Sequence, residues 1–177
     1  FTTHEGFNAG IWKNDNATDN QAATDYDKKW IPGQWKVPEA YDNPASNDPW
    51  YFSAIREANY FLETVVPRFE KGEIEGSETN IKHYIGEMYF LRAKNYLSKL
   101  ETFGDFPIIK NTLPDESESL IQASKRAPRY KVAHFILEDL DQAISLLTNN
   151  ISGGKNRITK NAALLLKSRA ALFEASW

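Results

Sequence analysis

Aromatic residues are concentrated at the beginning of this sequence, where four of the five tryptophans lie within the first 50 residues. Asparagine, aspartate and glutamine residues surround them. Flat aromatic rings can stack on the apolar C–H faces of a sugar ring, while neighbouring amides and carboxylates bond to its hydroxyl groups. This composition predicts a saccharide-binding surface. Its candidate stacking residues are Trp12, Trp30, Trp35 and Tyr41, and its candidate polar contacts are Asn16 and Asp27.

The same aromatic residues have a structural alternative, in which they pin an irregular segment onto a helical scaffold. Residues 1–47 are rich in Asn, Asp, Thr, Gly and Pro and have no sustained hydrophobic period, which favours turns and loops. A disordered segment would contain few large aromatic residues. We therefore expect an ordered, irregular, aromatic-rich N-terminal segment. Trp50 and Trp177 are expected to belong to helices and to serve packing.

No set of residues typical of catalysis is found in the sequence. The three histidines, His4, His83 and His134, do not have the spacing of metal ligands, and cysteine is absent. There is no Gly-rich phosphate-binding loop and no nucleophile elbow. Pairs of carboxylates occur in Gly-, Ser- and Pro-rich stretches that are typical of solvated turns. The sequence therefore predicts a protein that is not an enzyme, with no catalytic residue, no metal site and no cofactor.

Charge and hydropathy exclude two further classes of protein. The formal net charge is -3 and no dense cluster of Lys and Arg appears, so nucleic acid is not an expected partner. No apolar run approaches the roughly 20 residues that cross a bilayer.

The sequence begins with Phe1 and ends within an unfinished helical pattern. We interpret it as an interior piece of a longer protein.

Four helices are predicted after residue 47, because apolar residues recur there at spacings of three and four. They are expected over residues 48–66, 77–103, 129–148 and 159–177. Asp48 and Pro49 are expected to start the first helix and Pro67 to stop it. Gly104 is the expected C-terminal cap of the second, and Thr159 the N-cap of the fourth. The link over residues 105–128 is expected to be a loop. Since no long alternating pattern appears, the predicted fold class is all-α.

An internal repeat relates the second and fourth expected helices at an offset of 77 residues. Leu91-Arg92-Ala93 followed by Tyr96 matches Ser168-Arg169-Ala170 followed by Phe173. The four helices then form two antiparallel hairpins that stack as in tetratricopeptide-like arrays. The two arginines are interpreted as clamps between helices. Their partners, left open by the sequence, are among Glu87, Glu101, Glu138 and Asp139. The expected organisation is an irregular segment over 1–47 and a helical scaffold over 48–177.

Five short stretches carry a resemblance to a known family. They are Trp50 with Ile55-Arg56-Glu57-Ala58-Asn59, Gly86 to Ala93, Phe103 to Ile109, Tyr130 with Ile136 to Leu140 and Ala143, and Thr159 to Leu172. In this order they resemble the helical scaffold of the SusD/RagB family of outer-membrane lipoproteins over residues 50–174. The first 47 residues are similar to the family only in general character.

The resemblance implies a SusD-like, tetratricopeptide-like fold whose C-terminal half lies outside this sequence. It implies a non-catalytic cell-surface subunit that binds a nutrient, most often a glycan, for polysaccharide utilisation. The implied partner is a SusC-like TonB-dependent transporter in the outer membrane, and the implied membrane attachment is a lipid anchor outside this sequence. The alternative is a helical-repeat adaptor that binds only proteins and takes no small-molecule ligand.

Overall fold

The computed structural model describes residues 31–34, 50–150 and 156–177. The chain divides into two units, Phe1–Glu39 and Ala40–Trp177. In the first unit, residues 31–34 form a turn in which the Gln34 N–H donates to the Ile31 carbonyl at 2.9 Å. The predicted boundary between residues 47 and 48 lies outside the described residues. The described residues 50–150 and 156–177 belong to the second unit.

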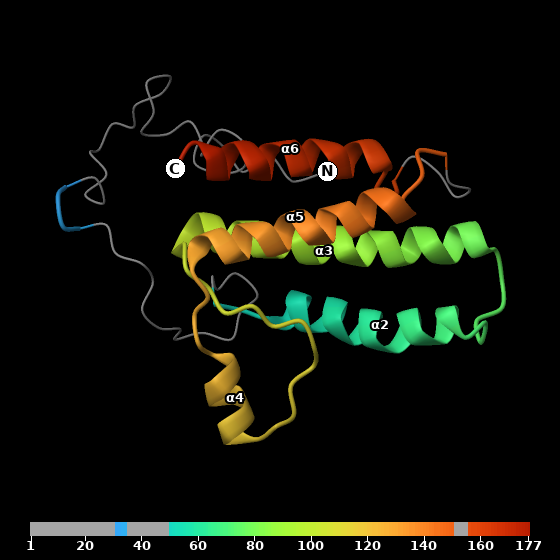
Figure 1. Ribbon diagram of the computed structural model, residues 1–177, viewed down its shortest axis with the longest axis horizontal. Helices are drawn as coiled ribbons and strands as arrows, with labels where there is room; N and C mark the ends of the chain where they lie inside the picture. Colours follow the sequence, from blue (N-terminus) through green and yellow to red (C-terminus); the bar gives the residue numbers. More distant parts are fainter. Residues whose placement is uncertain (1–30, 35–49, 151–155) are drawn as a thin grey trace, which may run out of the picture. The chain divides into compact units, whose positions relative to one another are not determined.

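The second unit is a stack of helices (Figure 1). Its elements are α2 (Ser53–Glu70), α3 (Glu78–Phe103), α4 (Ser117–Ala123), α5 (Arg129–Leu146) and α6 (Lys160–Ala175). Helix α3 packs on α2 and on α5, and α5 packs on α6. The pairs α2/α3 and α5/α6 run antiparallel, as predicted (Figure 1). The described residues contain no strand, only an isolated bridge between Phe106 and Ala127. None of the described helices combines the length and hydropathy of a membrane span.

Three predicted helix ends are confirmed by their capping geometry. The Ser77 hydroxyl accepts from the Asn80 N–H at the start of α3, and the Thr159 hydroxyl accepts from the Ala162 N–H at the start of α6. At the end of α3, Gly104 has a φ of 71°, a backbone conformation that other residues adopt at a cost. These ends could be predicted because each cap depends on one side chain and its immediate neighbours.

The predicted end of the first helix was wrong. Pro67 lies inside α2, which continues to Glu70. Proline lacks an N–H but keeps its carbonyl, and the Pro67 carbonyl accepts from the Lys71 N–H at 3.2 Å. The chain leaves the helix at Gly72, with a φ of 71°. The predicted starting residues, Asp48 and Pro49, lie outside the described residues, and the first helical residue is Ser53.

Two further predictions need correction. The link over residues 105–128 contains the seven-residue helix α4. None of its residues is buried, and its sequence shows no apolar stripe from which a helix could be predicted. Trp50 and Trp177 both lie outside helices. The Trp50 ring packs before α2 against Phe103, with ring centroids 4.1 Å apart. Trp177 follows α6 and is 87% exposed.

The main core lies where α3 packs on α5, and its buried side chains come from α2, α3, α5, α6 and the segment after α3. They are Ile55, Ala93, Tyr96, Leu97, Leu100, Phe103, Phe106, Val132, Ala133, Phe135, Ile136, Leu140 and Ala170. The two alanines of the internal repeat, Ala93 and Ala170, are both buried in it. A smaller cluster of Ala143, Leu147 and Ala163 fixes the far ends of α5 and α6.

Gly86 permits the closest approach between α3 and the end of α5. A Cβ atom at this position would lie 3.0 Å from Leu147 Cγ and 3.1 Å from Leu146 Cβ. We expect Gly86→Ala to lower the free energy of unfolding by about 1 kcal/mol, because overpacking costs about 1–3 kcal/mol and helix propensity returns at most about 1 kcal/mol. Urea denaturation measures this. Ser98→Ala, at an exposed position of the same helix, is the control, and a stabilised Gly86→Ala variant would contradict the close approach.

Candidate functional site

The predicted sugar-binding residues lie outside the described residues. This applies to all six, namely Trp12, Asn16, Asp27, Trp30, Trp35 and Tyr41. Their role as a stacking surface therefore stays a prediction. In the part of the chain that is described, two features concentrate polar chemistry and open space: a buried polar network between α2, α3 and α5, and a pocket beside it.

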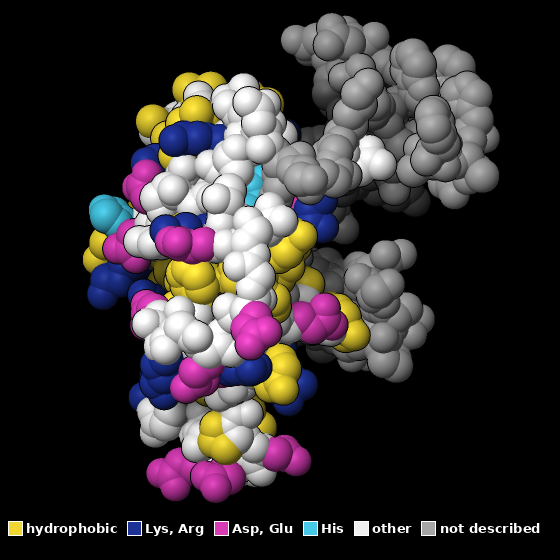
Figure 2. All heavy atoms as spheres, turned by 90° about the vertical axis from the view of Figure 1, so that its right-hand side faces the viewer, with side chains coloured by type: hydrophobic (Ala, Val, Ile, Leu, Met, Phe, Trp, Pro, Cys, Tyr) yellow, Lys and Arg dark blue, Asp and Glu magenta, His cyan; other side chains and the backbone are white. Residues whose placement is uncertain are grey.

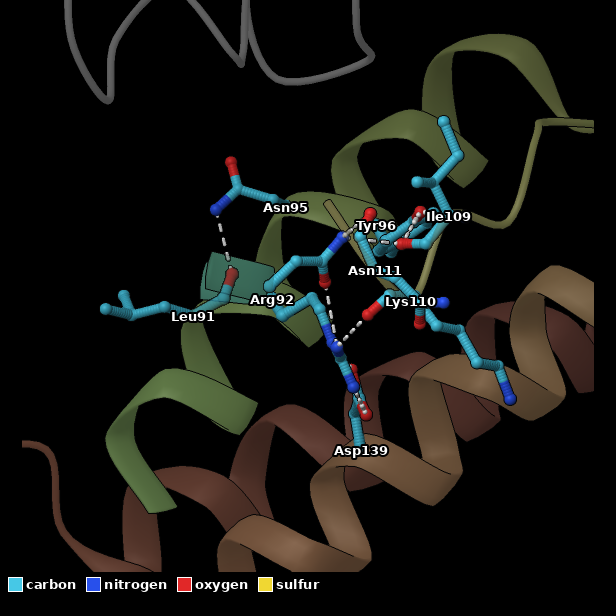
Figure 3. A network of polar contacts seen from close by, with 9 residues as sticks. Leu91, Arg92, Asn95, Tyr96, Ile109, Lys110, Asn111 and Asp139 are labelled. Carbon is cyan, nitrogen blue, oxygen red and sulfur yellow. Dashed lines mark hydrogen bonds and ion pairs between the residues drawn. The ribbon is translucent and has the colours of Figure 1, made fainter. Parts of the chain in front are cut away.

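The buried network is centred on Arg92 (Figure 3). Its guanidinium donates from Nε and Nη2 to the two carboxylate oxygens of Asp139, at 2.7 and 2.8 Å. Its Nη1 donates to the Asn59 side-chain oxygen at 2.8 Å and to the Lys110 carbonyl at 3.3 Å. Bidentate pairs of this kind are among the strongest hydrogen-bonded contacts in proteins. Arg92 thereby joins α3 to α2, α5 and the segment after α3.

The ion pair of Arg92 and Asp139 is buried, and the Phe135 ring lies 5.2 Å from the guanidinium carbon. Burial raises the pKa of Asp139, and the hydrogen bonds and charge of Arg92 oppose this effect. The pair has no access to a ligand, so the prediction that Arg92 is a structural clamp is confirmed and its partner is Asp139. Its repeat counterpart Arg169 is exposed and lies 3.9 Å from Glu101.

The same network fixes the segment over residues 107–112. The Asn59 amide donates to the carbonyls of Ile109 and Asn111, at 2.9 and 3.3 Å. The Tyr96 hydroxyl donates to the Ile109 carbonyl at 3.1 Å and accepts from the Ile109 N–H at 2.8 Å. Burial raises the pKa of Tyr96 to about 12, so this hydroxyl keeps its proton at neutral pH. At the end of the segment, the Thr112 hydroxyl donates to the Glu63 carboxylate at 2.5 Å.

This fixed segment forms one wall of a pocket of about 550 Å³. The beginning of α2 and the region of α4 supply the other walls. The lining residues are Trp50, Phe52, Ile55, Arg56, Asn59, Pro107, Ile109, Asn111, Leu113, Leu120, Ser124 and Arg126. Ligand sites in proteins are typically apolar clefts of about 300–1,000 Å³ with a few polar groups. The pocket therefore has the size and the composition of a small-molecule site.

Two arginines are the charged side chains among the described lining residues of the pocket. The Arg126 guanidinium carbon lies 5.1 Å from the centre of the Trp50 ring. Arg56 projects from the first turn of α2. The described lining residues include no aspartate or glutamate. No local sequence pattern indicates this site, because its walls come from three segments of the chain.

A second polar cluster lies near the other end of α3. His83 is fully buried, and its Nε2 lies 3.5 Å from a Glu87 carboxylate oxygen. The Thr148 N–H points to His83 Nδ1 at 3.3 Å, and Glu87 also pairs with Arg157. The described residues contain no group of three His, Asp or Glu side chains placed to hold a metal ion. These contacts tie α3 to residues between α5 and α6, which is a structural role.

Surface charges are mixed on the face shown in Figure 2. Lys and Arg side chains are interspersed there with Asp and Glu side chains. This face has no concentrated basic surface of the kind that holds a nucleic-acid backbone.

Comparison with known proteins places these features in a family. A family model named SusD-like and described as "Starch-binding associating with outer membrane" matches residues 4–172. No curated protein matches the chain. A SusD-like protein from Bacteroides fragilis NCTC 9343 is 30% identical, with a TM-score of 0.57 over 68% of this chain and 22% of its own.

Two other solved structures share the fold. A laminarin-binding SusD-like protein is 24% identical, with a TM-score of 0.55 over 67% of this chain and 24% of its own. A SusD-like carbohydrate-binding protein from Bacteroides vulgatus ATCC 8482 is 20% identical, with a TM-score of 0.53 over 68% of this chain and 26% of its own. The predicted SusD-like helical fold is confirmed by these similarities. The chain spans only about a quarter of the length of these relatives.

Proposed function

Because this chain belongs to the SusD-like family, we propose that it is part of a non-catalytic subunit that binds carbohydrate at the outer membrane. The family match is the observation that carries the proposal. In the described part of the chain, the charged members of the polar network are held in mutual contacts. A binding subunit needs a shaped surface and no reactive group.

The proposed carbohydrate contacts are the aromatic residues of the N-terminal segment. Trp30 and Trp35 are the main candidates, with Trp12 and Tyr41 as further stacking residues and Asn16 and Asp27 as hydroxyl partners. Stacking and hydroxyl bonding of this kind give modest affinities, around micromolar or weaker, which corresponds to roughly 8 kcal/mol or less. The preferred glycan is set by how these groups are spaced.

Isothermal titration calorimetry and affinity gels with a panel of polysaccharides test this proposal. We expect the wild-type chain to bind at least one glycan and the variant Trp30→Ala with Trp35→Ala to bind it at least tenfold more weakly. Tyr130→Ala is the matched control, because Tyr130 is a 60% exposed aromatic residue on α5. Binding to no glycan would contradict the function, and unchanged binding by the double variant would contradict the two tryptophans. Release of reducing sugar from the panel would contradict the non-catalytic role.

The proposed partner is a SusC-like TonB-dependent transporter, and the proposed attachment is a lipid anchor at the cell surface. Both follow from the family and concern the whole protein. Affinity purification from a detergent-solubilised outer membrane tests the partner, with the expected result that a TonB-dependent barrel is recovered with the full-length protein. Protease accessibility on intact cells tests the surface location.

A protein-binding adaptor is the second candidate function, and one observation favours it. An apolar groove of about 440 Å³ runs between α2 and α3, and Tyr60 at its edge is 64% exposed. Grooves between paired helices can accept an amphipathic helix from a partner. Recovery of a stable protein partner together with no glycan binding would favour this alternative over carbohydrate capture.

A further inference from the structure

Beyond carbohydrate capture, we propose that the pocket between α2, residues 107–113 and α4 binds a small amphipathic organic anion. The apolar body of the ligand occupies the pocket, and its single carboxylate or sulfonate pairs with Arg56 and Arg126. The residues of this site are different from the proposed sugar-binding residues of the N-terminal segment, and the two proposals are tested independently.

The distribution of ion pairs singles out these two arginines. All seven arginines of the sequence lie among the described residues. Five of them, Arg68, Arg92, Arg129, Arg157 and Arg169, have a carboxylate partner within 4 Å. The two without such a partner among the described residues, Arg56 and Arg126, line the same pocket, and none of the described lining residues is acidic. In a chain with a formal net charge of -3, this leaves a local excess of positive charge facing a cavity.

The apolar walls define the rest of the ligand. Ile55, Pro107, Ile109, Leu113 and Leu120 line the pocket and offer no hydrogen bond through their side chains. A neutral sugar carries a hydroxyl on most of its carbons, and burying these groups without partners costs free energy. The ring of Trp50 is also occupied, by Phe103 and by the guanidinium of Arg126. These walls favour an aliphatic or aromatic body over a saccharide.

The site is held in place before a ligand arrives. Asn59 and Tyr96 fix one wall of the pocket through three hydrogen bonds with Ile109 and one with the Asn111 carbonyl. Contact with the Trp50 ring restrains the Arg126 guanidinium. A fixed wall and a restrained cation reduce the entropy that would be lost on ligand binding. Such preorganisation is expected of a binding site, whereas a mere packing defect does not require it.

The test uses the fluorescent probe 8-anilinonaphthalene-1-sulfonate and its neutral relative N-phenyl-1-naphthylamine, titrated into the full chain. The two probes share their apolar body and differ in the sulfonate. We expect the variant Arg56→Gln with Arg126→Gln to bind the sulfonate probe roughly tenfold more weakly. Hydrogen bonds between charged groups are stronger than those between neutral groups, and partial exposure of the two arginines limits the effect to this size. Its affinity for the neutral probe should stay within about twofold. Arg169→Gln is the control for loss of an exposed arginine elsewhere, and it should change neither affinity.

A second variant locates the apolar body. Leu120 lines the pocket and is 43% exposed, so Leu120→Trp should fill the space with little effect on the fold and remove binding of both probes. Competition by 1-naphthaleneacetate, and not by 1-naphthaleneacetamide, would extend the result to carboxylates.

The proposal is overturned if the double arginine variant keeps its affinity for the sulfonate probe, if it loses both probes equally, or if Leu120→Trp binds as the wild type does. Glycan binding measured on the same variants should be unchanged, which separates this site from the proposed function.

Discussion

Replacing Arg92 by leucine is expected to lower the free energy of unfolding by about 3–5 kcal/mol, the typical cost of leaving one partner of a buried ion pair unpaired. Asp139 would keep its burial and lose the two hydrogen bonds from the guanidinium. The Asn59 side-chain oxygen and the Lys110 carbonyl would lose a donor as well. Helices α2, α3 and α5 and the 107–112 segment would all be affected, because Arg92 contacts each of them.

Urea denaturation followed by circular dichroism measures this effect. The internal repeat supplies a matched control: Arg169→Leu removes the corresponding arginine of α6, whose side chain is 73% exposed. It should change the free energy of unfolding by less than about 0.5 kcal/mol. A loss below about 1 kcal/mol for Arg92→Leu would contradict the view that the pair is a principal link between the helices.

A double variant separates the effect of the unpaired Asp139 charge from the effect of the other contacts that Arg92 makes. Arg92→Met combined with Asp139→Leu removes both charges, and replacing a whole buried ion pair with apolar residues is often neutral or stabilising. We expect it to recover at least half of the loss seen in Arg92→Leu. A double variant as unstable as the single one would assign the loss to the contacts with Asn59 and Lys110.

The repeat also shows what could be predicted from the sequence and what could not. Arg92 and Arg169 occupy equivalent positions, and both were predicted to be clamps. Only Arg92 lies between two helices, with α2 on one side and α5 on the other, so only Arg92 is buried. A sequence pattern places a residue on a face of its helix. Burial depends on what packs against that face, and the pattern carries no information about this.

Elements determined by local chemistry were predicted well. The caps at Gly104 and Thr159 and the start of α3 near Ser77 were correct, because each depends on a few adjacent residues. Pro67 was misjudged, because a proline near the end of a helix removes a single hydrogen bond and leaves its own carbonyl free to accept. Helix α4 was missed because it is short and its apolar residues Leu120 and Ile121, which are 43% and 64% exposed, form no stripe that points to a core.

The pocket could not be predicted for a different reason. Its arginines are 70 positions apart in the sequence (Arg56 and Arg126), and its apolar wall comes from a segment between them. Hydrogen bonds between residues far apart in the sequence, such as those of Asn59 and Tyr96 to Ile109, hold that wall in place. The family could be predicted from the sequence although the pocket could not. The five stretches that carry the resemblance are short, continuous parts of the helical scaffold.

Replacing Phe106 by alanine is expected to lower the free energy of unfolding by about 3–5 kcal/mol, the usual cost of truncating a buried phenylalanine. Phe106 is fully buried, and its ring lies 5.2 Å from that of Phe52, 5.3 Å from Phe103 and 5.7 Å from Trp50. Its backbone also exchanges two hydrogen bonds with Ala127, at 3.2 and 3.1 Å. The side chain thus fills the space between the end of α3, the approach to α2 and the approach to α5.

Phe106→Leu is the matched control, because it keeps most of the apolar volume and should cost less than about half as much as alanine. Urea denaturation measures both variants, and near-ultraviolet circular dichroism reports the loss of the stacked rings. Since Trp50 and Phe52 line the anion pocket and both contact Phe106, the alanine variant should also weaken binding of both naphthalene probes. A variant that loses less than about 1 kcal/mol and retains both probes would show that the ring cluster is dispensable. The turn that carries Phe106 would then serve to connect helices and would not support the pocket.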